Sequence, residues 1–141
     1  MIDQITVFLE NSEGRLAALC RVMANAKINM YALTIADASD YGLVRIICDD
    51  PERASQVLKD ANFQANITKV SAIEVPNVPG GLADLLDVLD AADVNIEYGY
   101  CFASSEGRAI EVLKMHGRER GLVALKEAGY KVLQPEDVYK S

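Results

Sequence analysis

Hydrophobic and polar positions follow two different periods along the first half of the chain, and the periods alternate in a fixed order. Residues 5–9 read Ile-Thr-Val-Phe-Leu, with Ile, Val and Leu at every second position, as in a strand with one face on a core. From residue 16 to residue 26, leucine, cysteine, methionine and alanine recur at the spacing of an amphipathic helix. β-Branched and aromatic residues then dominate residues 28–35 and 43–48, on either side of a turn-forming stretch at 37–42. The pattern predicts a strand, a helix and a β-hairpin.

The next segment predicts a second helix and a closing strand. Apolar residues recur at helical spacing within residues 54–61, and Asp50 and Pro51 precede them as a cap and a first-turn residue. A short strand at residues 63–68 follows. The order strand, helix, strand, strand, helix, strand is the ferredoxin-like plan, in which an antiparallel sheet carries its helices on one face. We therefore expect an α+β fold.

The chain contains this unit twice. The segment from Asn11 to Met30 reappears 66 residues later as Asn77 to Ile96, with Asn, Gly, Leu, Ala, Leu, Val, Ala and Asn identical in register. After one inserted residue the match continues at a spacing of 67, through a turn at 103–107 to a short final strand at residues 130–133. Self-similarity at a fixed period means that one supersecondary unit is used twice. We expect two ferredoxin-like βαββαβ modules in tandem, at residues 1–68 and 69–134, and a C-terminal tail at 135–141 outside the repeat.

Each copy alone is at the lower size limit of an independent domain. A chain of 141 residues buries roughly two-thirds of its unfolded surface, whereas a half of 66 residues is marginal. We therefore expect the halves to pair through sheet edges or helices, and we expect the protein to form a homodimer.

Charge and hydropathy exclude several classes of partner. The net charge is -7 and the pI is about 4.7, whereas binding to nucleic acid or an anionic membrane draws most of its affinity from clustered Lys and Arg. No run approaches the 18 or more apolar residues of a membrane span, and the N-terminus lacks a secretory pattern. We expect a cytoplasmic protein without nucleic-acid or membrane partners.

Residues with the chemistry of catalysis or metal binding are sparse. Three widely separated cysteines, without a Cys-x-x-Cys pair or a histidine at ligand spacing, predict neither a disulfide nor a metal site, and we expect them to be small buried hydrophobes. The lone histidine, His116, precedes a glycine in a loop and is expected to be solvated. No nucleophile and base are paired in the sequence. We expect no catalytic residue, no cofactor and no enzyme activity.

The junction between the first strand and the first helix is the best conserved part of the repeat between the two copies. It reads Asn-Ser-Glu-Gly-Arg-Leu at residues 11–16 and Asn-Val-Pro-Gly-Gly-Leu at 77–82. The central glycine permits a positive φ, and the free amides at the start of the following helix favour a carboxylate. An asparagine side chain adds a donor and an acceptor, so the loop suits the zwitterionic head of an amino acid.

The Asn-x-Pro-Gly-x-Leu loop of the second copy, with Asn95-Ile96 opening the next strand, resembles the ACT domain family. The resemblance covers about residues 3–134 as two domains and implies regulatory binding of an amino acid. In that family the ligand typically lies between two domains, against the loop before the first helix of one and the start of the second strand of another. The loop residues that the resemblance implies for ligand binding are Asn11, Gly14, Arg15, Leu16, Asn77, Pro79, Gly80, Gly81 and Leu82, and those facing the ligand are Asn29, Met30, Asn95 and Ile96.

Three functions stay open at this point. A sensor without an attached catalytic domain would act through a partner such as a metabolic enzyme or regulator. Asn and Gly are also ordinary turn and cap residues, so the chain could instead be a pure interaction module without a ligand. A ferredoxin-like enzyme is the third alternative. The first loop also departs from the family pattern, because Glu13 replaces the proline found at Pro79 and adds negative charge near an anion site.

Overall fold

The computed structural model describes residues 1–36, 40–103 and 107–139, and the turns predicted at residues 37–42 and 103–107 lie partly outside this part of the chain. Its contacts divide the chain into two compact units. We call them the N-terminal unit, which contains Asp3–Thr68 and Tyr139, and the C-terminal unit, which contains Lys69–Val138 and the first two residues. The fold is α+β, and each unit carries strands and helices in the predicted order.

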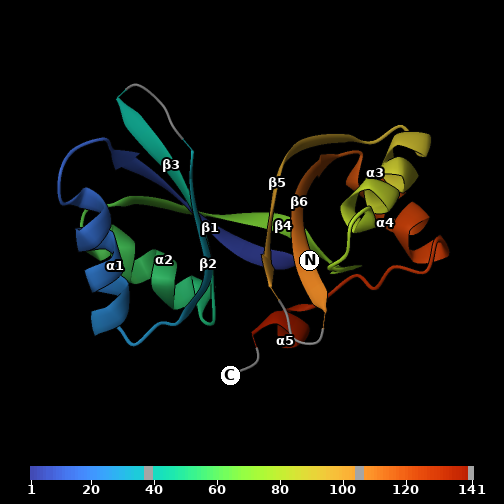
Figure 1. The fold of residues 1–141 in the computed structure, drawn as a ribbon. Coiled ribbons are helices and arrows are strands. Elements are labelled where there is room, and N and C mark those ends of the chain that lie inside the picture. The colour runs from blue at the N-terminus through green and yellow to red at the C-terminus, as the bar shows by residue number, and fades with distance from the viewer. Residues whose placement is uncertain (37–39, 104–106, 140–141) are drawn as a thin grey trace. The chain divides into compact units, whose positions relative to one another are not determined.

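The N-terminal unit is a ferredoxin-like module. Its strands lie in the order β2-β3-β1-β4, and β3 runs antiparallel to both β1 and β2. Both helices lie on the same side of the strands (Figure 1). The elements are β1 (Ile2–Glu10), α1 (Arg15–Asn25), β2 (Met30–Ala36), β3 (Tyr41–Cys48), α2 (Pro51–Asp60) and the first residues of β4 (Gln64–Pro76).

The C-terminal unit repeats this arrangement. The later residues of β4 serve as its first strand, so the strand predicted to close one copy and the strand predicted to open the next are a single 13-residue strand. Its strand order is β4-β6-β5, and β6 runs antiparallel to both neighbours. The further elements are α3 (Gly81–Ala91), β5 (Asn95–Ala103), β6 (Arg108–His116), α4 (Arg118–Glu127) and α5 (Pro135–Val138).

The final strand predicted at residues 130–133 is wrong as a full strand. It is reduced to one isolated bridge between Ile73 and Val132. Two backbone hydrogen bonds support this bridge: the amide of Glu74 donates to the carbonyl of Lys131, and the amide of Leu133 donates to that of Ala72. Pro135, three residues after Val132, has no amide to extend the ladder, and it opens α5.

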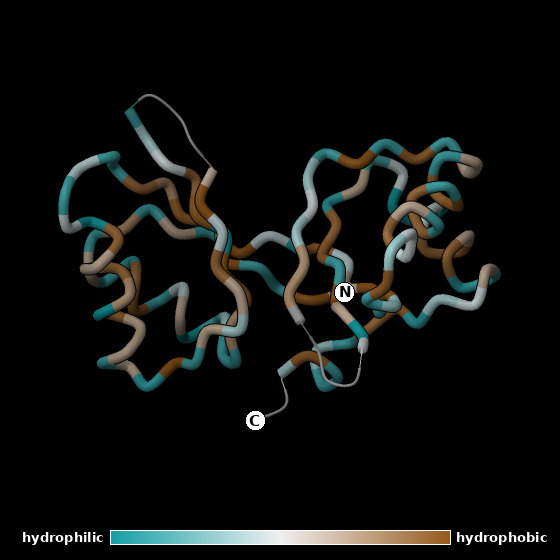
Figure 2. Tube along the Cα trace, in the orientation of Figure 1, coloured by the Kyte–Doolittle hydropathy of each residue, from teal (hydrophilic) through white to brown (hydrophobic). Residues whose placement is uncertain are grey.

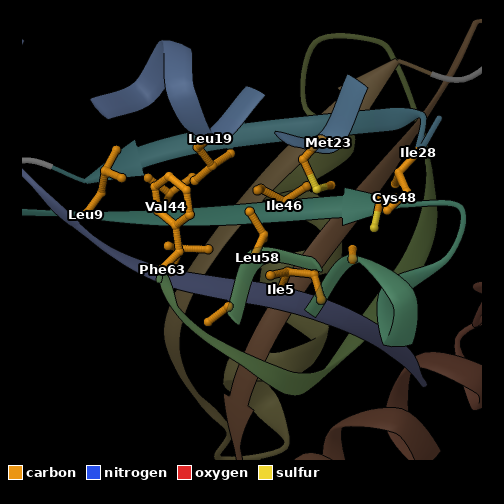
Figure 3. Close-up of a cluster of buried hydrophobic side chains, with 13 residues drawn as sticks. Ile5, Leu9, Leu19, Met23, Ile28, Val44, Ile46, Cys48, Leu58 and Phe63 are labelled. Carbon is orange, nitrogen blue, oxygen red and sulfur yellow. The ribbon is translucent and has the colours of Figure 1, made fainter. Parts of the chain in front are cut away.

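Each unit has its own hydrophobic core between helices and strands. In the N-terminal unit, Leu19 and Met23 of α1 meet Val44 and Ile46 of β3 (Figure 3), and all four are fully buried. In the C-terminal unit, Leu85 and Leu89 of α3 are buried at the positions that correspond to Leu19 and Met23. Hydrophobic and hydrophilic residues alternate along the helices (Figure 2), as the amphipathic pattern predicts.

The four longer helices end in the same way. The residue after each C-cap has a positive φ: 59° at Lys27, 69° at Asn62, 59° at Asp93 and 91° at Gly129. The next amide then donates back to the last full turn, as from Ile28 to the carbonyl of Met23 at 3.0 Å. This Schellman arrangement satisfies carbonyls at the helix end and sets the start of the following strand.

The C-terminal residues 135–139 are folded. Val138 of α5 is 6% exposed. The Tyr139 ring stacks on Tyr31 with the centroids 6.4 Å apart, and its hydroxyl donates to the Asp3 carbonyl and accepts from the Asp3 amide, both at 3.2 Å. Among the described residues, no helix is long and apolar enough to cross a membrane.

Candidate functional site

The two strand-to-helix loops share one backbone geometry. Gly14 has φ 83° and ψ -11°, and Gly80 has φ 83° and ψ -9°, both in the left-handed region. The positive φ predicted for both glycines is therefore confirmed. Each glycine is the N-cap of its helix, and its carbonyl accepts the first helical hydrogen bond at 2.9 Å, from Ala18 in the first loop and Asp84 in the second.

No side chain caps either helix. A glycine at the N-cap has no side-chain oxygen to accept from the amides of the first turn, unlike the Ser, Thr, Asp or Asn usual at this position. The first helical amide donates to a loop carbonyl, from Arg15 to Ser12 at 3.4 Å and from Gly81 to Val78 at 3.0 Å. The next amides of the first turn have no helical partner and lie at the positive end of the helix dipole. The same feature at both loops makes each of them a suitable place for a carboxylate.

The asparagines fix the loops to the ends of the β-hairpins. The Asn11 amide donates to the Asp40 carbonyl at 3.0 Å, and the Asn77 amide donates to the Gly107 carbonyl at 2.8 Å. Both asparagines are exposed. Their backbones therefore have a structural role, while both residues stay exposed to solvent.

A pocket of about 210 Å³ adjoins the first loop. This volume is below the ~300–1,000 Å³ of drug-sized sites and suits a smaller ligand. Glu10 and the exposed Asn11 supply polar atoms, while Leu16 and Ile35 supply apolar walls. The lining residues are Leu9, Glu10, Asn11, Ser12, Leu16, Ile35 and Gly42.

The position after the N-cap glycine differs between the loops. In the first loop the Arg15 guanidinium lies over the Phe63 ring, with its central carbon 4.5 Å from the centroid, a cation–π contact. In the second loop a Cβ at Gly81 would collide with the Pro76 carbonyl oxygen, so glycine is needed for the close approach of the backbone. Pro79 and Leu82 are exposed at this loop.

The residues expected to face the ligand lie at the start of the second strands. Asn29 and Asp49 are joined by two hydrogen bonds: the Asn29 amide donates to the Asp49 carboxylate and the Asp49 amide to the Asn29 carbonyl, both at 3.1 Å. In the C-terminal unit, Asn95 lies opposite His116 in the β5–β6 ladder. Met30 and Ile96 are partly buried against the cores of their own units, which leaves only part of each side chain for a ligand.

Within one unit, the strand-to-helix loop and the start of the second strand lie far apart. In the N-terminal unit, Glu10 beside the loop lies opposite Tyr41, whereas Met30 lies opposite Cys48 at the other end of β3. The seven residue steps between Tyr41 and Cys48 correspond to about 23 Å of strand. A ligand that contacts both groups therefore needs residues from a second module.

The cysteines give no sign of nucleophilic chemistry. Burial raises the pKa of the Cys48 thiol to about 11, so little thiolate forms at neutral pH. Cys20 is half-buried, but Cys101 is exposed, so the prediction that all three are buried is wrong for Cys101. That residue lies on β5, the edge strand of its unit, where a side chain is covered on fewer sides. Within the described part of the chain, no group of His, Cys, Asp and Glu has the arrangement of a metal site.

Several lining residues of the first loop are absent from the sequence prediction. Ile35 and Gly42 line the pocket because of strand pairing, since Gly42 lies opposite Leu9. Phe63, which follows the C-terminal end of α2, packs against the Arg15 guanidinium. An explicit register for the hairpin would have placed Gly42 beside the loop. The contact between Arg15 and Phe63 has no such signal in the sequence.

Comparison with known proteins gives a consistent family and fold. A family model described as an ACT domain pair matches residues 1–138. A crystal structure of a protein from Bacteroides thetaiotaomicron has 42% sequence identity and a TM-score of 0.92, covering 99% of this chain and 96% of that one. Curated proteins yield no match.

More distant structures share the fold. The ligand-free regulatory subunit of aspartate kinase from Thermus thermophilus has 18% identity and a TM-score of 0.67, covering 90% of this chain and 92% of that chain. Aspartate kinase from Clostridium acetobutylicum has 11% identity and a TM-score of 0.58, covering 89% of this chain and 32% of that chain.

Proposed function

The chain belongs to the ACT domain family, and on that premise we propose that it is a non-catalytic regulatory sensor that binds an amino acid at its strand-to-helix loops. The observation that carries the proposal is the duplicated loop geometry, in which an uncapped helix start follows a left-handed glycine at Gly14 and again at Gly80. An amino acid needs donors for its carboxylate and acceptors for its ammonium group. The helix amides provide the donors, and the side chains of Asn11 and Asn77 provide the acceptors.

The proposed site takes its two walls from different modules. The loop residues and the second-strand residues lie at opposite ends of each unit, so the loop of one module would act with Asn29 and Met30, or Asn95 and Ile96, of another. The two predicted modules, residues 1–68 and 69–134, are the functional domains in this proposal. We include a homodimer in it, because a second copy is one source of the second module.

The regulated target in this proposal is a separate enzyme or regulator of amino-acid metabolism in the cytoplasm. The support is family membership together with a fold shared with regulatory subunits of aspartate kinase. The structurally similar kinase from Clostridium acetobutylicum is an allosteric enzyme. In that enzyme the matching region is a minor part of the chain, consistent with a regulatory module that accompanies a catalytic one.

Thermal denaturation with each of the twenty amino acids tests the proposal. A ligand at 100 times its dissociation constant stabilises the folded state by about 2.7 kcal/mol, which raises Tm by several degrees. We expect one amino acid or a small related group to do so. If no amino acid shifts Tm while the protein still captures a cellular enzyme, the pure interaction module is the correct function.

A further inference from the structure

The two copies differ in charge at the corner between the third strand and the second helix. At the spacing of 67, Asp49 and Asp50 of the N-terminal unit correspond to His116 and Gly117 of the C-terminal unit. In the N-terminal unit, the Asp49 carboxylate accepts the Asn29 amide at 3.1 Å and the Asp50 carboxylate accepts the Arg53 amide at 3.3 Å. Both carboxylates are absent from the other unit.

The side chain of Arg120 occupies this corner in the C-terminal unit. Its Nε and Nη2 atoms donate to the carbonyls of Ala92 and Asp93 at 3.3 and 2.7 Å. The same Nη2 atom lies 2.7 Å from the position that a Cβ on Gly117 would take. At the same spacing Arg120 corresponds to Arg53, so the C-terminal unit keeps the arginine of this corner and lacks both carboxylates.

A cavity of about 440 Å³ opens beside this guanidinium, and we call it the β6–α4 cavity. It is lined by Glu97, Lys114, Met115, His116, Gly117, Arg118, Glu119 and Arg120. Three of these side chains are permanently cationic and two are anionic, so the cavity is positive within a chain whose net charge is -7. Its volume lies within the ~300–1,000 Å³ of small-molecule sites.

We propose that the β6–α4 cavity binds a small polyanion that carries either phosphate groups or several carboxylates. Such a ligand would restore the negative charge that Asp49 and Asp50 supply at the equivalent corner. Lys114 and Arg118 would contact it directly. The Arg120 guanidinium would face it while staying hydrogen-bonded to the carbonyls just after the end of α3. The cavity contains none of the residues assigned to the amino-acid site, but it adjoins two of them, because Asn95 lies opposite His116 and Ile96 lies opposite Met115 in the β5–β6 ladder.

Amide chemical shifts of the full chain, titrated with inorganic pyrophosphate and with citrate at constant ionic strength, test this proposal. We expect saturable shifts at residues 114–120, and no saturable shifts at residues 47–53. Pyrophosphate binding alone assigns a phosphate ligand, and citrate binding alone assigns a polycarboxylate. No saturable shift with either probe, or equal shifts at both corners, overturns the proposal.

Two substitutions in the cavity and one control substitution elsewhere test the same binding. His116→Asp introduces the residue that the N-terminal unit tolerates at this position, and it should weaken binding at least about ten-fold, because it adds a negative charge within the cavity. Arg118→Gln should weaken binding about three- to five-fold, as expected for one partly exposed ion pair. Lys59→Gln, an exposed charge on α2, is the matched control and should leave binding unchanged. Unaltered binding in both cavity variants overturns the proposal. The Tm response of Arg118→Gln to amino acids reports separately on the loop site, whereas His116→Asp does not serve for this comparison because His116 lies opposite Asn95.

Discussion

At the scale of single residues, Gly80 is required for its φ of 83°. Crowding is not the reason, because a Cβ there would meet no atom within 4 Å. A β-branched residue at φ 83° costs at least about 1–2 kcal/mol, so Gly80→Val should rotate the helix start and abolish amino-acid binding while leaving most secondary structure intact. Gly80→Asn is the matched control, since Asn tolerates the left-handed region and should keep most of the affinity. Calorimetry on both variants measures the difference. Equal affinity for wild type and Gly80→Val would remove the loop from the site.

Glu111 introduces a carboxyl group into the core of the C-terminal unit. It is 6% exposed on β6, at the position where the N-terminal unit has the fully buried Val44. Burial raises the pKa of the Glu111 carboxyl above its usual 4.5. The unfolded chain therefore ionises first as pH rises, and the free energy of unfolding falls from about pH 4.5 up through the raised pKa.

Replacing this carboxyl with an amide should remove the pH dependence. We expect Glu111→Gln to raise Tm at pH 7 and to leave it nearly unchanged at pH 4, where the carboxyl is protonated in both states. The exposed Glu127 on α4 provides the control, because Glu127→Gln should change Tm little at either pH. A lower Tm for Glu111→Gln at pH 7 would mean that the ionised carboxylate stabilises the fold.

These two residues show where sequence reasoning succeeds and where it stops. The positive φ of Gly80 follows from the loop repeat, because both copies place glycine immediately before a helix. The burial of Glu111 does not follow, since a glutamate in an alternating strand is normally assigned to the solvent face. Comparison of the two copies position by position would have indicated a buried site for Glu111, because it occupies the position of Val44 in the repeat.

At the scale of elements, the predicted order of strands and helices is confirmed, while the ends of elements depend on tertiary contacts. Asp50 caps α2 and Pro51 opens it, as the sequence predicts. The final strand of the second copy is one bridge, and Pro135 cannot extend the ladder beyond it. The tail then folds, which repeat analysis cannot foresee because it has no counterpart in the first copy.

Tyr139 anchors this tail to the N-terminal unit. Burial raises the pKa of its phenol to about 12, although the hydrogen bond with the Asp3 backbone acts in the opposite direction. Tyr139→Phe keeps the stacking on Tyr31 and loses the hydrogen bonds, so it should cost about 1 kcal/mol. Tyr139→Ala loses both and should cost more. Urea unfolding of the two variants measures these costs, and equal stability of wild type and Tyr139→Ala would show that the contact contributes nothing.

At the scale of the whole molecule, the residues at the two chain ends do not belong to the units that the sequence repeat would assign them to. Tyr139 belongs to the N-terminal unit, and the first two residues belong to the C-terminal one. The strand β4 also passes through the boundary without a break, so both units depend on it. The predicted modules, residues 1–68 and 69–134, follow each other without a linker, in agreement with this continuity. No sequence pattern reveals that the chain ends belong to the opposite units.

A fragment of residues 1–68 should therefore be unstable or self-associate. It ends within β4 and lacks the Tyr139 ring that stacks on Tyr31, and a module of this size buries only about 60% of its unfolded surface. Its truncated β4 would also present an unpaired edge, which favours pairing with another copy. Sedimentation and circular dichroism, with a fragment of residues 1–76 that retains all of β4 as the comparison, measure the outcome. A folded monomer from residues 1–68, with a cooperative transition close to that of the full chain, would show that each module is stable without the second.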